Sequence, residues 1–133
     1  MTLILCLDDR GGMSFNRRRQ SRDTAILEDI HSSLTGPLLV TPYSVPLMEE
    51  ARIPWALMAD PLPEEGQCFP EIGPVPQELL GRASALVIYR WNRLYPSDVL
   101  WDTDPASLGF VRTQTLEFAG RSHERITKEV YTK

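Results

Sequence analysis

Two continuous apolar runs constrain the fold of this chain more than any other feature of its sequence. Residues 3–7 read Leu-Ile-Leu-Cys-Leu, and residues 85–89 read Ala-Leu-Val-Ile-Tyr. A strand with one face in water alternates apolar and polar residues, whereas a strand buried on both faces is apolar throughout. We therefore expect both runs to be central strands of a sheet whose two faces are covered.

The segments between these runs alternate helix and strand signals. Apolar residues recur at helical spacing over residues 26–34, after an N-cap at Ser21 or Asp23, and Gly36-Pro37 ends that helix. Further strands are expected at residues 38–41, 53–58, 99–101 and 110–118, and further helices after Ser44, at 77–83 and at 122–133, with a strand as the alternative for the last segment. Residues 8–20 and 61–76 are expected to be irregular loops.

This alternation predicts one layered α/β domain over residues 1–133, with a mainly parallel sheet centre and an antiparallel C-terminal edge. A chain of 133 residues with 42% hydrophobic and 24% charged residues can bury its own core. Cys6 and Cys68 show no paired spacing, and the first apolar run is too short for a membrane span. We expect a soluble protein of a reducing, cytoplasmic compartment that contacts no membrane.

Polar clusters follow the predicted strands. Asp8-Asp9-Arg10 follows the first strand, Arg90-Trp91-Asn92-Arg93 follows the second apolar run, and Arg121-Ser122-His123-Glu124 follows residues 110–118. Ligand crevices of open α/β sheets form at the carboxyl edge of the strands, so these clusters are expected to meet around one cleft. The alternative is that loops are polar wherever they occur.

An arginine-rich segment at the start of the first predicted helix suggests an anion site. Free N–H groups at a helix start favour an anion, and the arginine fork matches phosphate oxygens. The candidate anion-binding residues are Arg17, Arg19, Ser21, Arg22, Arg90, Asn92 and Arg93. The alternative is that these arginines pair with Asp8, Asp9 and Asp23 or lie solvated on the surface. The net charge of −4 disfavours a protein that coats extended duplex nucleic acid.

Three residues are candidates for catalysis. His123 is the best acid–base candidate because an unperturbed histidine titrates near neutral pH. Asp8 and Asp9 are candidates for acid–base chemistry or for holding Mg²⁺, with ion pairing to arginine as the alternative. Trp91 is a candidate stacking platform for a flat ligand group, with burial in the core as the alternative.

Three sequence blocks resemble a family of short proteins from anaerobic Gram-positive bacteria that carries the label ribonuclease Z. The blocks are residues 6–23, 89–98 and 120–131, which begin Cys-Leu-Asp-Asp-Arg, Tyr-Arg-Trp-Asn-Arg and Gly-Arg-Ser-His-Glu. True ribonuclease Z enzymes need a His-x-His-x-Asp-His metal motif, and the two isolated histidines here do not build one. The resemblance therefore implies a bacterial setting and no particular chemistry.

Residues 3–22 also resemble dihydrofolate reductase in their order of elements, because an apolar first strand leads through a glycine-containing loop to a helix. Two functional hypotheses remain open. The first is a small phosphate- or nucleotide-binding protein, with phosphoryl-transfer or nuclease-like chemistry. The second is a non-catalytic protein-binding module, such as an immunity or regulatory protein, whose acidic middle and proline-rich loop meet a partner.

Overall fold

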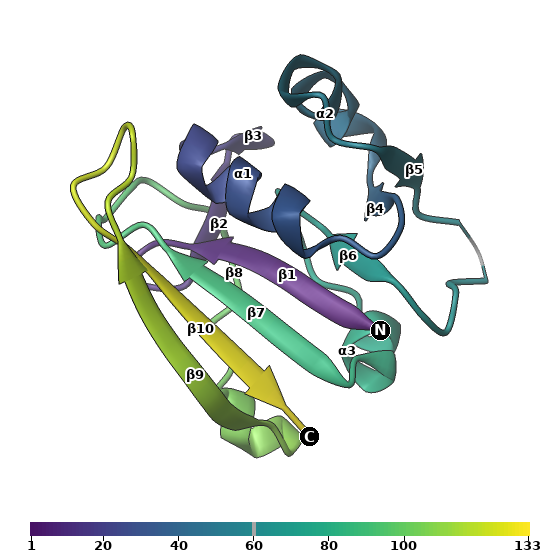
Figure 1. Cartoon of the computed structure of the whole chain (residues 1–133). Coiled ribbons are helices and arrows are strands. Elements are labelled where there is room, and N and C mark those ends of the chain that lie inside the picture. Colours follow the sequence, from purple (N-terminus) through teal and green to yellow (C-terminus); the bar gives the residue numbers. More distant parts are fainter. Residues whose placement is uncertain (60) are drawn as a thin grey trace.

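A seven-stranded mixed sheet forms the centre of the computed structural model, which describes residues 1–59 and 61–133. Its strand order is β5-β4-β6-β1-β7-β10-β9 (Figure 1). The first five strands in this order are parallel, whereas β10 is antiparallel to both β7 and β9. The strands are β1 Thr2–Leu7, β4 Leu38–Val40, β5 Trp55–Leu57, β6 Gln67–Phe69, β7 Ala85–Arg90, β9 Val111–Phe118 and β10 Ile126–Thr132.

Three helices cover the two faces of the sheet. They are α1 Thr24–Ser33, α2 Val45–Ala51 and α3 Gln77–Arg82, and a short 3-10 helix at Pro42–Ser44 leads into α2. A second 3-10 helix lies at Pro105–Leu108. A small separate sheet joins β2 Gly12–Phe15 to β3 Arg18–Arg19 and to β8 Val99–Leu100.

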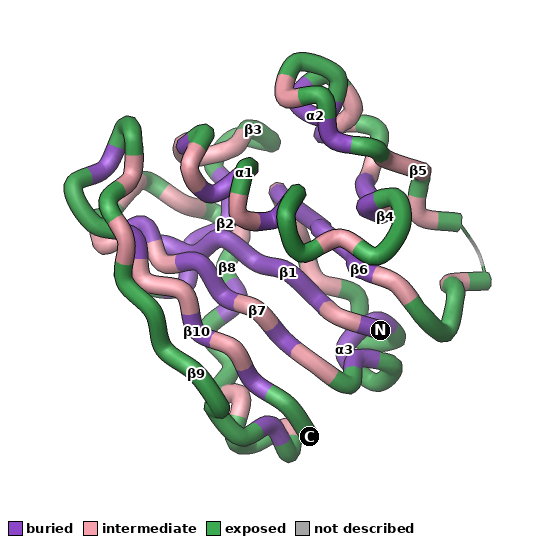
Figure 2. Tube along the Cα trace, viewed as in Figure 1, coloured by how far each residue is buried: buried purple, intermediate pink, exposed green. Residues whose placement is uncertain are grey.

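Side chains of β1 point alternately into two hydrophobic clusters, which explains why residues 3–7 are all apolar. Leu3, Leu5 and Leu7 pack in one cluster with Leu79 of α3, whereas Ile4 and Cys6 belong to the cluster on the opposite face. That second cluster contains the buried side chains of α1 and α2. The expected central position of β1 and β7 is confirmed (Figure 2), although Val87 of β7 remains partly exposed.

The expected fold class is confirmed, with a parallel centre and an antiparallel edge at the C-terminal strands. One edge strand, β9, is exposed over nearly its whole length (Figure 2). No helix in the described part of the chain is long and apolar enough to cross a membrane.

Two expected loops contain strands. Residues 61–76 include β6, which pairs with β1 and with β4 in the middle of the sheet. This strand has only three residues and is flanked by proline and glycine, so no periodic pattern identifies it. Residues 8–20 likewise include β2 and β3, which pair with each other in the small separate sheet, where β2 also pairs with β8.

The helix expected at residues 122–133 is wrong, because residues 126–132 form β10. A register shift between Val130 and Tyr131 interrupts the pairing of β10 with β9. Ile126, Glu129 and Tyr131 are the buried residues of this strand, so burial does not follow strict alternation. An irregularity of this kind removes the period-two signal, and the remaining spacing of apolar residues imitates a helix.

Candidate functional site

The carboxyl ends of β1, β7 and β9 lie at one edge of the sheet. Two successive antiparallel pairings, β7 with β10 and β10 with β9, make β9 run in the same direction as β7. Residues 119–125, which connect β9 to β10, therefore lie at the same edge as the residues that follow β1 and β7. This arrangement brings together segments that are far apart in the sequence.

His123 is the centre of a buried hydrogen-bonded cluster at this edge. Its ring is 5% exposed and stacks on Trp91, with 4.7 Å between ring centroids. Its Nδ1 atom lies 3.0 Å from Asp23 Oδ2, and its Nε2 atom lies 2.8 Å from the Tyr95 hydroxyl and 3.2 Å from Ser21 Oγ. Each nitrogen of the ring thus has a polar partner.

Asp23 holds His123 in place from the N-terminus of α1. Its carboxylate caps the helix by accepting from the N–H of Ala25, and it also accepts from the N–H groups of Arg121 and Ser122. Burial alone raises the pKa of Asp23, but these hydrogen bonds and the one from His123 outweigh burial and lower that pKa to about 2. The carboxylate is therefore ionised at neutral pH.

An ionised Asp23 fixes the tautomer of the neutral histidine. The N–H of Nδ1 donates a hydrogen bond to the carboxylate, so Nε2 is left as an acceptor that faces the hydroxyl groups of Ser21 and Tyr95. Hydroxyl, imidazole and carboxylate then stand in the order that general-base activation of a hydroxyl requires. Tyr95 is the closer hydroxyl and Ser21 is the more distant one.

Asp8 follows β1 and is 1% exposed. Its carboxylate accepts from the N–H groups of Arg10, Gly12 and Tyr95 and from the side-chain amide of Gln20. Burial raises the pKa of Asp8, but these hydrogen bonds outweigh burial and lower it. A carboxylate offers about four acceptor positions, and four donors already occupy them. Asp8 therefore anchors the segment that follows β1.

The pair Asp8 and Asp9 shows no metal-binding arrangement. Asp9 is exposed, and the oxygens of Asp8 point to protein donors. Across residues 1–59 and 61–133, no group of three histidine, cysteine, aspartate or glutamate side chains is placed to hold a metal ion. Mg²⁺ binding therefore gains no support from the geometry.

The arginines of the predicted anion segment do not share one partner, although Arg19, Ser21 and Arg22 all line one crevice. Arg19 forms two hydrogen bonds to Glu71, and Arg22 pairs with Glu50 at the surface. Arg17 is exposed in the turn between β2 and β3, where its φ is positive. Arg90 pairs with Glu129 of β10. The partners of Arg19, Arg22 and Arg90 are glutamates remote in sequence and not the aspartates near them, whereas Arg17 lies at the surface.

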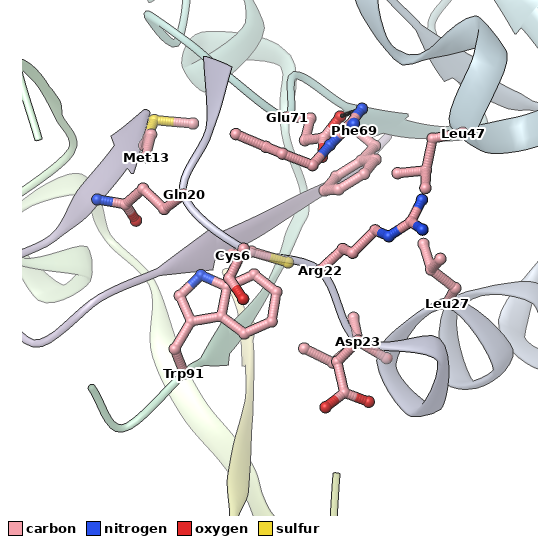
Figure 3. A pocket seen from close by; sticks show the side chains of 13 residues that line it. Cys6, Met13, Gln20, Arg22, Asp23, Leu27, Leu47, Phe69, Glu71 and Trp91 are labelled. Carbon is pink, nitrogen blue, oxygen red and sulfur yellow. Dashed lines mark hydrogen bonds and ion pairs between the residues drawn. The ribbon is translucent and has the colours of Figure 1, made fainter. Parts of the chain in front are cut away.

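A crevice lies between the carboxyl ends of β1 and β6, and the protein's own side chains fill most of it (Figure 3). The apolar wall is formed by Cys6, Phe69, Leu27 and Leu47. Arg19 also lines the crevice and is hydrogen-bonded there to Glu71. The remaining cavity measures about 20 Å³. That volume accommodates about one water molecule.

A second, open cleft of about 570 Å³ lies beside His123. It is lined by Trp91, Asn92, Arg93, Ser122, His123, Glu124 and Arg125. Four of the predicted site residues, His123, Trp91, Asn92 and Arg93, thus line this cleft, whereas Arg17, Arg19, Arg22 and Arg90 do not. Ser21 contacts His123 but is not among the lining residues. Trp91 is only 5% exposed and His123 covers one of its faces, so its stacking role stays a prediction.

Sequence reasoning missed several residues of the site. Asp23 was expected only as a helix cap, and no role in the site was expected for Tyr95, Glu71 and Arg125. Tyr95 follows Arg90-Trp91-Asn92-Arg93 by two positions and bridges the two halves of the cluster, since its N–H donates to Asp8 and its hydroxyl contacts His123. A wider search for aromatic hydroxyls near the strand end would have included it.

No family model matches this chain, and no curated protein matches it. Among solved structures, a dihydrofolate reductase from Enterococcus faecalis, complexed with NADP(H) and RAB-propyl, matches with a TM-score of 0.64. The likeness shows the fold. The alignment covers 99% of this chain and 95% of the reductase chain at 14% identity. The resemblance to dihydrofolate reductase in the order of the first elements is therefore confirmed at the level of the fold alone.

Proposed function

We propose that this protein binds a small phosphate-bearing ligand, of nucleotide class, in the open cleft beside His123. The observation that carries the proposal is the lining of this cleft by two arginines, Arg93 and Arg125. Its volume of about 570 Å³ falls within the range of small-molecule sites. Both arginines are exposed and therefore accessible to a ligand.

The two arginines are available because neither is held in a close ion pair. Among the described residues, Arg93 has no carboxylate within ion-pair distance, and its guanidinium lies 6.0 Å from the centre of the Tyr95 ring. Arg125 approaches Glu117 only to 3.7 Å, and both side chains are more than half exposed. Guanidinium groups in this state favour phosphate oxygens, to which they donate two parallel hydrogen bonds.

Asn92 supports the cleft by holding its two walls together. Its side-chain amide donates to the backbone carbonyl of Arg125 and to the hydroxyl of Thr127. This contact ties the residues after β7 to the start of β10 and so sets the separation of the two arginines. Asn92 therefore serves as a positioning residue, not as a direct anion ligand.

The solved reductase of the same fold carries NADP(H), which supports a nucleotide as the ligand class. In this chain the crevice between β1 and β6 is filled, so we place the ligand in the open cleft. His123 lies in the wall of that cleft, and because its Nε2 atom faces the hydroxyls of Tyr95 and Ser21, its acid–base chemistry on a phosphate ester would be relayed through one of these hydroxyls. Phosphoryl-transfer or nuclease-like activity would depend on this residue.

Calorimetric titration with NADPH, ATP and inorganic phosphate tests the proposal. The double variant Arg93→Gln/Arg125→Gln should bind the preferred ligand about 10- to 100-fold more weakly, since two charge-assisted contacts are lost. Arg112→Gln is the matched control, because Arg112 is an exposed arginine on β9 and does not line the cleft.

Equal affinities for the double variant and the control would refute the proposal. The absence of binding by the wild-type protein would also refute it, and would leave the non-catalytic protein-binding module as the surviving interpretation. Binding that weakens as salt concentration rises is expected, because exposed charges are screened.

A further inference from the structure

We propose that the crevice between β1 and β6 is a second binding site, specific for a guanidinium or amidinium group, and that Arg19 occupies it as an internal ligand. The proposal does not depend on the anion site described above. It rests on the surroundings of the Arg19 guanidinium, which consist of a buried carboxylate, a buried hydroxyl and an aromatic ring.

The carboxylate of Glu71 provides the recognition. It is 6% exposed, and its two oxygens accept from Arg19 at 2.6 Å to Nε and 3.0 Å to Nη2. The fully buried Ser44 donates its hydroxyl proton to Glu71 Oε1 at 2.7 Å, which keeps the carboxylate oriented. Two parallel N–H donors with this spacing are present in guanidinium and amidinium groups and absent from an alkylammonium group.

Tyr43 completes the site by covering one face of the cation. The central carbon of the Arg19 guanidinium lies 4.8 Å from the centre of the Tyr43 ring. A flat, delocalised cation is favoured over an aromatic face. The receptor thus consists of the Glu71 carboxylate, the Ser44 hydroxyl that orients it and the face of the Tyr43 ring. These groups match a guanidinium group and not an anion.

The receptor and its occupant belong to different parts of the fold. Glu71 comes two residues after β6, in the middle of the main sheet, and Tyr43 and Ser44 belong to the 3-10 helix that leads into α2. Arg19 comes from β3, which has two residues and pairs only with β2 outside the main sheet. The receptor groups are therefore carried by segments other than the hairpin that carries Arg19, and the hydrogen bond from Ser14 Oγ to the carbonyl of Ile72 links the two.

The position of the crevice also suits a ligand. The chain leaving β1 leads to α1 on one face of the sheet, and the chain leaving β6 leads to α3 on the other. Strand ends whose connections diverge in this way leave a crevice where ligands bind in open α/β folds. The apolar wall formed by Cys6, Phe69, Leu27 and Leu47 would contact an alkyl or aryl group attached to the cation.

Removal of Arg19 alone would leave a buried carboxylate without a counter-ion, which is energetically costly. An external guanidinium or amidinium compound should compensate for this loss. In the wild-type protein the tethered Arg19 competes with such a compound, because a short tether gives a group a high effective concentration. External ligands should therefore bind the wild-type protein more weakly than the variant that lacks the arginine.

The experiment uses ethylguanidine and benzamidine as probes. Butylamine is the control cation, because it lacks the two parallel N–H donors. Thermal unfolding and calorimetric titration are measured for the wild-type protein, for Arg19→Ala and for Arg19→Ala/Glu71→Gln. Arg19→Ala should be less stable than the wild-type protein and should be restabilised by both probes but not by butylamine. The wild-type protein should bind the probes at least about tenfold more weakly than Arg19→Ala.

Two results would overturn the proposal. One is equal probe binding by Arg19→Ala and by the double variant, and the other is the absence of saturable binding by the wild-type protein. If Arg19→Ala does not fold, Arg19→Lys replaces it, because lysine keeps the charge but lacks the fork. Probe binding by Arg19→Lys that is no tighter than by the wild-type protein would equally overturn it.

Discussion

His123 Nδ1 lies 3.0 Å from Asp23 Oδ2, although 100 positions separate the two residues in the sequence. Asp23 also accepts from the N–H groups of Arg121 and Ser122, the two residues before His123. One carboxylate therefore fixes both the backbone and the side chain of the segment that connects β9 to β10. Its replacement should affect the position of His123 as well as the start of α1.

Asp23→Asn should lower the free energy of unfolding at pH 7 by about 2 to 4 kcal/mol, because an amide cannot accept from all of these donors. The folded-state pKa of Asp23 is about 2, below the unfolded value of 3.8. The ionised form therefore stabilises the fold above about pH 4, and its contribution of about 2 kcal/mol is lost as the pH falls toward 2.

Urea unfolding at pH 7, 4 and 2 measures both effects. Asp23→Asn should show a smaller loss of stability between pH 4 and pH 2 than the wild-type protein. Asp102→Asn is the control, since Asp102 is exposed. An Asp23→Asn variant with the same acid sensitivity as the wild-type protein would contradict the assigned role of this carboxylate.

Gly120→Ala should destabilise the protein by about 1 to 3 kcal/mol and disturb the His123 cluster. A Cβ at position 120 would lie 2.5 Å from Asp23 Oδ2 and 2.7 Å from the carbonyl oxygen of His123. Gly81→Ala is the matched control, because a Cβ at this position in α3 has no neighbour within 4 Å.

Gly81→Ala should be neutral or stabilising by up to about 1 kcal/mol, since alanine favours a helix. Thermal unfolding of both variants gives the comparison. The NMR signals of the His123 ring should shift in Gly120→Ala and remain in place in Gly81→Ala. Unchanged ring signals in Gly120→Ala would show that the cluster tolerates the added methyl group.

Asp8→Asn should cost about 2 to 4 kcal/mol of stability, whereas Asp9→Asn should change stability by no more than about 0.5 kcal/mol. Asp8 is buried and accepts from four donors, and Asp9 is exposed. Chemical denaturation checks this difference. Addition of Mg²⁺ should leave the melting temperature of the wild-type protein unchanged, and a rise that depends on Asp8 would restore the metal-site hypothesis.

The thiols of Cys6 and Cys68 should be unreactive in the folded protein. Both are buried, and burial raises the pKa of Cys68 to about 11. Burial, with the negative charge of Glu71, also raises the pKa of Cys6. Because the thiolate is the reactive form, labelling by a disulfide reagent at pH 8 should follow the rate of unfolding and reach two thiols in denaturant. Fast labelling without denaturant would contradict this burial.

The sequence predicted the centre of the sheet and the edge at which polar residues gather, because continuous apolar runs and strand ends are local signals. It did not predict β6, whose three residues are held in place by β1 and β4 and not by a pattern of their own. The helix prediction for the residues of β10 was wrong for a related reason, since the irregular pairing of β10 with β9 obscures the alternation of apolar and polar residues that is typical of a strand.

The partners of the arginines were beyond sequence reasoning. Arg19 and Glu71 are 52 positions apart, and no residue type near either one indicates the other. The sequence suggested an anion ligand for Arg19, but the folded chain supplies a glutamate. Pairing between remote side chains depends on how the loops are placed in the fold. A single sequence contains no local pattern that indicates such a pair.

The direction of β9 has a consequence for how the lining of the open cleft can be changed. β9 and β10 form a continuous hairpin on one side of β7, and its connection at residues 119–125 delivers His123 to the site. Changes in this connection would alter His123 and Arg125 while the strands of the sheet keep their sequence. Because Asp23 accepts from the N–H groups of Arg121 and Ser122, a designer who rebuilds the connection would have to keep these two residues in place, so the part open to redesign is the short stretch that follows them.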